Sequence, residues 1–206
     1  MSMEDYIAAR KEGIKQLHAL ESRGQDPYLP VLAELVPKLN QMAQVPLGLV
    51  QIGLDQIEGT ATKGRTTAFA RGFLPLLEQD SEFATKWSIL YDGIVEDGLR
   101  QPIVALEYYN RFYIVEGNKR VSVMRRLDAV NIEANVTRVL PEAEDSERYR
   151  VYQEFLSFYA DTKLNFIVFS REGSYERLYK LIGKTPGEKW TPEDLFDFQS
   201  CFYRFQ

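Results

Sequence analysis

The hydrophobic pattern of the first 44 residues predicts two helices joined by a turn. Apolar side chains recur at helical spacing between residues 4 and 22, with charged residues between them: Tyr6, Ile7, Ile14, Leu17 and Leu20. The segment Arg23–Pro27 contains a glycine and a proline, which favour a turn. Residues 30–42 then return to an amphipathic helical pattern. We therefore expect residues 1–44 to form a helical hairpin.

Between residues 45 and 140 the pattern changes to short apolar runs that alternate with helical segments. Strands are predicted where β-branched and aromatic residues cluster, over residues 45–57, 101–116 (a hairpin turning at Tyr108–Arg111) and 135–140. Helical spacing predicts helices over residues 68–77, 82–96 and from Lys119–Arg120 to Leu127. This order predicts an α+β fold: a small mixed sheet with flanking helices over residues 45–140.

Residues 141–206 form a third region, in which aromatic side chains are concentrated. Fifteen of the 26 Phe, Tyr and Trp residues lie from Tyr149 onward. Helices are predicted over residues 148–160, over 174–182 and from a capping box at Thr191 and Asp194, with a strand-like run at 165–169. The final apolar run has no cap. We therefore expect a mainly helical extension, truncated from a longer protein, that contacts a protein partner or the rest of that chain.

Composition excludes several classes of function. The single cysteine, Cys201, and the single histidine, His18, exclude a disulfide framework and a Cys/His zinc site. No metal site is assigned, although a carboxylate-only Mg²⁺ or Ca²⁺ site stays open. The net charge of −5 gives no overall basic character. The N-terminus lacks the apolar run of a signal peptide, and no segment is long enough for a membrane helix, so we expect a soluble cytoplasmic protein without membrane contact.

A glycine at the end of a strand, followed by cations that open a helix, is typical of a phosphate-binding site. Gly117, Asn118, Lys119 and Arg120 have this arrangement. Five cationic residues and one acidic residue lie between residues 111 and 126, although the whole chain is acidic. We expect these four residues to hold phosphate, with Arg120 as the main ligand. A solvated basic helix start has the same composition, and Arg125 is expected on the exposed face of that helix.

The segment from residue 60 to 67 is a second candidate for phosphate binding. It carries four threonines, one glycine and two cations directly after a predicted strand and turn. Lys63, Arg65 and Thr66 supply the cationic and hydroxyl donors that phosphate oxygens accept. A flexible surface loop fits the same composition equally well.

Three ordered segments resemble the N-terminal domains of ParB proteins, and together they cover a little under half of the chain. The first runs from the strand before Asp55-Gln56-Ile57 into the polar loop and resembles the family's first box. The second, Leu90–Val104, is similar to the family's helix followed by Gly-Leu-x-Gln-Pro-Ile-x-Val. The third, Phe112–Arg120, is similar to the family's Tyr-x-Ile-x-x-Gly-Glu-Arg-Arg. The chain thus resembles the ParB/sulfiredoxin fold.

The resemblance implies nucleotide binding, with phosphates held by Gly117–Arg120 and by the first-box loop that contains Arg65. It places the Gln101–Pro102 turn beside the pocket. A nucleoside triphosphate, with or without Mg²⁺, is the implied ligand. Sulfiredoxins carry a catalytic cysteine directly after the glycine, where this chain has Asn118, so sulfinic-acid reduction is excluded.

Glu116 and Glu58 are the carboxylates nearest to the two loops in sequence. Either could act as a base in phosphoryl transfer or hold Mg²⁺. The alternative is a structural carboxylate that pairs with Arg65 or Arg120. If the protein is an enzyme, the expected chemistry is NTP hydrolysis or phosphoryl transfer.

The leading functional hypothesis is a ParB-like module of a bacterial-type cytoplasmic protein that binds a nucleotide or another phosphate ligand. It would act as a slow NTPase or as a switch. Two alternatives stay open: a DNA-binding or nuclease-like module that uses the same basic patch on a phosphodiester, and a small-molecule kinase of the same fold.

Overall fold

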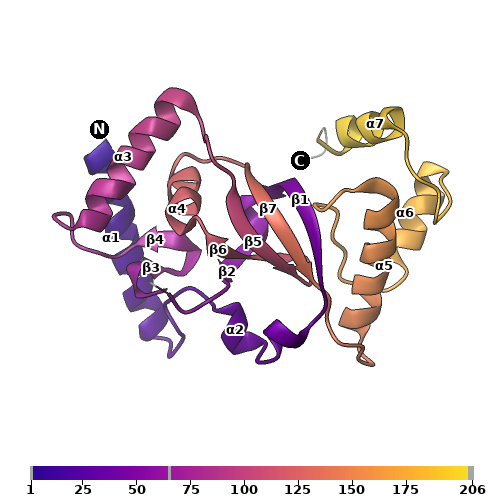
Figure 1. Cartoon of the computed structure of the whole chain (residues 1–206), viewed down its shortest axis with the longest axis horizontal. Coiled ribbons are helices and arrows are strands. Elements are labelled where there is room, and N and C mark those ends of the chain that lie inside the picture. The colour runs from indigo at the N-terminus through magenta and orange to yellow at the C-terminus, as the bar shows by residue number, and fades with distance from the viewer. Residues whose placement is uncertain (1, 65, 204–206) are drawn as a thin grey trace. The chain divides into compact units, whose positions relative to one another are not determined.

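The first of two units in the chain is built on a five-stranded mixed sheet. The computed structural model describes residues 2–64 and 66–203 (Figure 1), and the units are residues 1–141 and 142–206. The strand order is β1-β7-β5-β6-β2. Their bounds are Gln44–Gly53 for β1, Ile57–Thr60 for β2, Ile103–Tyr108 for β5, Arg111–Glu116 for β6 and Asn131–Val139 for β7. The β1–β7 and β5–β6 pairs are antiparallel, and the β5–β7 and β2–β6 pairs are parallel. The predicted α+β class with a small mixed sheet is confirmed.

Three longer helices flank this sheet. They are α1 (Ser2–Glu21), α3 (Glu82–Asp97) and α4 (Asn118–Arg126). The start of α3 follows from Ser81, whose hydroxyl accepts a hydrogen bond from the Ala84 amide at 3.2 Å. Helix α1 packs against α3 and against the short strand β4 (Leu74–Pro75). Its Tyr6 hydroxyl donates to the carbonyl of Leu77 at 2.7 Å, and Asp5 accepts from Arg126 of α4 at 3.1 Å.

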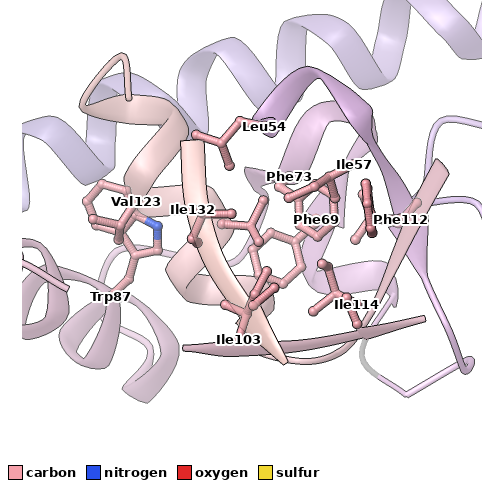
Figure 2. Packing of buried hydrophobic residues seen from close by; sticks show 14 of the residues in the cluster. Leu54, Ile57, Phe69, Phe73, Trp87, Ile103, Phe112, Ile114, Val123 and Ile132 are labelled. Atoms are coloured by element: carbon pink, nitrogen blue, oxygen red, sulfur yellow. The ribbon is translucent and has the colours of Figure 1, made fainter. Parts of the chain in front are cut away.

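The core lies between the inner face of the sheet and these helices. Figure 2 shows Ile103, Ile114 and Ile132, which come from three different strands, directed into one cluster with aromatic rings from the connecting segments. Trp87 of α3 is fully buried, and its indole Nε1 donates to Ser122 Oγ of α4 at 2.9 Å. Without this bond, the indole N–H would be buried with no hydrogen-bond acceptor. It also fixes α3 against α4.

The helix predicted over residues 30–42 is mostly absent, so the N-terminal hairpin is wrong in its second half. Only α2 (Leu32–Leu35) and a 3₁₀ turn at Leu39–Gln41 are helical. Pro37 disfavours helical backbone at the preceding residue, and Val36 has φ −129° and ψ 83°. Upstream, Pro30 accepts a hydrogen bond from the Thr60 amide at 2.9 Å, which keeps the chain extended beside β2.

The helix predicted over residues 68–77 is also wrong. The segment forms two-residue strands, β3 (Phe69–Ala70) and β4 (Leu74–Pro75), joined by a tight turn. Gly72 and Phe73 both have left-handed backbone, with φ of 75° and 64°, which a right-handed helix excludes. Within the strand predicted over residues 45–57, a 3₁₀ turn at Leu54–Gln56 separates β1 from β2, which continues to Thr60.

The second unit is helical, as predicted. It contains α5 (Glu147–Thr162), α6 (Ser174–Ile182) and α7 (Pro192–Tyr203). The expected strand at 165–169 is absent. Phe158 packs against the rings of α6 and the following loop, with centroid distances of 5.1 Å to Tyr175 and 5.9 Å to Trp190. In neither unit do the described residues include a helix long and apolar enough to cross a membrane.

The capping box that begins α7 makes this helix sensitive to acid. Thr191 donates to the Asp194 carboxylate through its amide and hydroxyl, both at 2.9 Å, and the Asp194 amide donates back to the hydroxyl at 3.2 Å. An ion pair with Lys184 and these bonds lower the pKa of Asp194 to about 2. Because the folded pKa lies below the ordinary value of 3.8, the stabilisation is present above pH 4 and is lost as the pH falls toward 2.

We therefore expect the first turn of α7 to fray between pH 4 and pH 2. Backbone carbon chemical shifts of residues 192–196 measured by NMR should move toward random-coil values over that range. In Asp194→Asn the shifts should start closer to random coil and change little with pH. Shifts in the wild type that stay constant down to pH 2 would contradict the assignment.

Candidate functional site

The candidate site lies where β6 ends and α4 begins. Gly117 connects the two elements with a left-handed backbone at φ 117°. A Cβ atom at this position would lie 2.5 Å from Ile103 Cγ2 of the neighbouring strand, so only glycine fits the turn. No side chain caps the helix that follows. The first amides of a helix have no partner within it, and the helix dipole favours an anion there.

A pocket of about 490 Å³ opens at this helix start. It is lined by one segment of the polar loop, by one face of α3 and by the β6–α4 turn: Gly64, Phe69, Phe83, Lys86, Leu90, Val115, Glu116, Gly117, Asn118, Lys119 and Arg120. The structure thus brings the two sequence-predicted loops to one cavity. Its volume is in the range of small-molecule sites.

Arg120 is fixed in the wall of the pocket by three acceptors. Its Nη1 donates to the backbone carbonyl oxygens of Gln101, at 3.1 Å, and Pro102. Its Nη2 donates to the Glu116 carboxylate at 2.9 Å. Only 14% of the Arg120 side chain is exposed, against 72% for Glu116. The guanidinium is therefore a preorganised cation with one displaceable partner.

The other polar groups of the pocket come from both sides. Lys119 Nζ lies 4.9 Å from the Phe83 ring centroid, and Asn118 has a buried side-chain oxygen with no hydrogen-bond partner. Lys86 of α3 pairs with Glu82, one turn earlier in that helix. Lys86 is not recognisable as a site residue from the sequence, because only the packing of α3 against α4 brings it near Gly117.

Of the remaining predicted ligands, Lys63, Thr66 and Gln101 are not part of the pocket lining. Lys63 forms an ion pair with Glu34 at 2.8 Å, and the Thr66 hydroxyl is bonded to the Lys63 carbonyl at 3.4 Å. Gln101 takes part through its backbone oxygen, which holds Arg120. Arg65 lies outside the described residues. From the first-box loop, Gly64 is the described residue that reaches the pocket.

The two candidate catalytic carboxylates are not brought together. Glu116 lines the pocket and pairs with Arg120, as the structural alternative for this residue predicts. Glu58 is exposed and acts electrostatically on Arg125, outside the pocket. A two-carboxylate arrangement at one site is therefore not formed by these residues.

The expectation that Arg125 lies on an exposed face is wrong. Its Nη2 donates to the carbonyl oxygens of Leu54, at 2.7 Å, and Ile57, at 2.9 Å, and its guanidinium lies over the Phe73 ring at 5.2 Å. Burial lowers the pKa of Arg125, and the charges of Asp55 and Glu58 oppose that shift. Arg125 is a structural clamp between α4 and the β1–β2 connection.

The described residues contain no group of three or more His, Cys, Asp or Glu side chains that could hold a metal ion. Among the solved structures that are similar to this chain is the crystal structure of sulfiredoxin from Arabidopsis thaliana. The two chains are 20% identical with a TM-score of 0.31, over 43% of this chain and 82% of that chain. No protein-family model matches the chain, and no curated protein matches it.

Gly117→Ala should lower the free energy of unfolding by about 2–4 kcal/mol. Alanine would be strained in the left-handed backbone conformation of this position, and its Cβ atom would clash with Ile103. Urea unfolding followed by circular dichroism measures the loss. Gly64→Ala is the matched control: its Cβ would meet nothing within 4 Å, and it should be neutral. Equal stability of the two variants would show that the turn does not require glycine.

Arg125→Ala should lower the free energy of unfolding by about 2–3 kcal/mol, because the carbonyls of Leu54 and Ile57 lose a charged donor. Arg100→Ala, which removes an exposed arginine paired with Asp97, should cost less than about 0.5 kcal/mol. Urea midpoints of both variants test the difference. A change at Arg125 no larger than at Arg100 would refute the clamp.

Proposed function

We propose that the pocket at the start of α4 binds a phosphate-bearing small molecule, with nucleoside triphosphates as the first class to test. The observation that carries the proposal is the placement of Arg120. Two backbone carbonyls hold its guanidinium in the wall of a cavity, beside an uncapped helix start. A fixed guanidinium and helix-start amides form an arrangement that suits phosphate oxygens.

The charge of the lining supports an anionic ligand. Lys86, Lys119 and Arg120 face one carboxylate, Glu116, around the same cavity. In a chain of net charge −5, this local excess of positive charge favours an anion over a cation. The charge is confined to one small cavity, which favours a small ligand over a nucleic-acid backbone.

The apolar part of the lining supports an organic phosphate rather than a bare anion. Phe69, Phe83 and Leu90 line the cavity next to the cations. Ligand sites combine such apolar surface with a few convergent polar groups. The proposed ligand therefore has a phosphate group for Arg120 and an apolar or aromatic group for this wall.

The chain's own residues would bind and orient the ligand. The amides of the first turn of α4 would donate to phosphate oxygens, Arg120 would fix the position of the group, and Lys86 and Lys119 would neutralise charge. Mg²⁺ would be held mainly by the ligand's phosphates, since that ion usually keeps phosphate and water ligands. Binding, rather than turnover, is the function that these contacts support.

A thermal-shift panel tests the proposal. ATP, CTP, GTP and inorganic pyrophosphate are compared, each with and without Mg²⁺, in a buffer free of phosphate. A ligand at 100 times its Kd adds about 2.7 kcal/mol to the free energy of unfolding, which raises the melting temperature by several degrees. If none of these compounds shifts the melting temperature at millimolar concentration, the proposal fails.

For any compound that raises the melting temperature in this panel, Arg120→Ala should increase the Kd about thirtyfold, because a charge-assisted contact of about 2 kcal/mol is lost. The variant also releases the Gln101–Pro102 turn, so its melting temperature should fall by a few degrees. Lys86→Ala removes an exposed pocket cation without that structural role and should weaken binding about threefold at unchanged stability.

Lys63→Ala is the control for these variants. It removes a lysine that pairs with Glu34 away from the pocket, so affinity should stay within about twofold of wild type. Isothermal titration calorimetry measures all three. Equal losses for Lys63→Ala and Arg120→Ala would indicate diffuse electrostatics and refute the pocket.

A further inference from the structure

We infer that Glu116 is a built-in competitor of the anion: its carboxylate accepts from Nη2 of Arg120 in the lining of the pocket, and ligand binding exchanges this carboxylate for a ligand oxygen. The inference rests on the proposed function and concerns the regulation of that same site.

The two terminal guanidinium nitrogens of Arg120, Nη1 and Nη2, have different roles. Nη1 is bonded to the carbonyls of Gln101 and Pro102, which belong to the backbone and cannot leave without unfolding the turn. Nη2 is bonded to Glu116 at 2.9 Å, and this partner is a side chain. An incoming anion can therefore replace Glu116 while Nη1 keeps Arg120 in place.

Because Glu116 is well exposed and Arg120 is not, the exchange costs little free energy. Glu116 is 72% exposed, so its released carboxylate is hydrated at once, whereas Arg120 is only 14% exposed and would be left without its one carboxylate partner. Ion pairs with one well-exposed member contribute little to stability. The pair thus neutralises Arg120 in the free protein and yields to a stronger anion.

The position of Glu116 in the chain also suits the exchange. It is the last residue of β6 and directly precedes Gly117, so its backbone is fixed by the sheet while its side chain lines the pocket. Glu82, which pairs with the pocket cation Lys86, has no such role, because Lys86 is itself 60% exposed and loses little when its partner moves.

The experiment measures the affinity for inorganic pyrophosphate by titration calorimetry at fixed low salt. Glu116→Gln removes the competing charge, and we expect it to bind three- to tenfold more tightly than wild type. Its melting temperature should stay within about 2 °C of wild type. Glu58→Gln makes the same change in net charge outside the pocket and should bind as wild type.

Glu116→Asp separates competition from simple repulsion through space. Aspartate keeps the negative charge, but its side chain is one methylene shorter, so it loses the contact with Arg120. Competition predicts tighter binding than wild type for this variant as well. Repulsion alone predicts affinity equal to or weaker than wild type, and that result would overturn the inference.

The outcomes also separate this inference from the proposed function. In one outcome the wild type binds pyrophosphate, with weaker binding in Arg120→Ala but no higher affinity in Glu116→Gln. That result would support the phosphate pocket and refute the competitor role of Glu116. A loss of affinity in Glu116→Gln would make Glu116 a contributor to binding and would likewise overturn the inference. Absence of pyrophosphate binding in wild type and in every Glu116 variant overturns the inference, whereas the proposed function is then decided by the nucleotides of the thermal-shift panel.

Discussion

The short helix α4 holds the first unit together, because its side chains bind four other segments of the chain. Arg120 fixes the Gln101–Pro102 turn, Ser122 accepts from the indole of α3, Arg125 clamps the β1–β2 connection, and Arg126 reaches Asp5 of α1. Each of these hydrogen bonds pairs a polar group of α4 with a polar group of another segment. The position of the helix, and with it the pocket at its start, is therefore determined by the whole unit.

The elements that could be predicted from the sequence are those whose signals are local. The hairpin of β5 and β6 and the capping box of Thr191 each depend on residues a few positions apart. The errors occur where distant segments decide the conformation. Residues 28–31 are extended because they lie beside two strands, with isolated bridges from Tyr28 to Ala70 of β3 and from Val31 to Thr60 of β2. The sequence of residues 28–31 alone does not indicate either neighbour.

In the candidate site, too, the residues that are consecutive in the chain could be predicted, and those that come from other elements could not. Gly117 to Arg120 are consecutive, so their shared location follows from sequence alone. Lys86 and Phe83 come from another helix and enter the site through tertiary packing only. Arg120 and Arg125 look equivalent in sequence, yet residues five apart lie roughly 140° from each other around a helix. One therefore lines the pocket, and the other is bonded to backbone carbonyls.

The attachment of α1 has a consequence for how the chain folds. The Tyr6–Leu77 bond joins residues 71 positions apart, and the Arg126–Asp5 bond joins residues 121 positions apart. During synthesis the first helix emerges long before either partner exists, with a side chain that ends completely buried. Closing such long loops is slow compared with forming local contacts. The amino-terminal helix is therefore among the last parts of the first unit to reach its final position, and until then its apolar face is open to other chains in the cell.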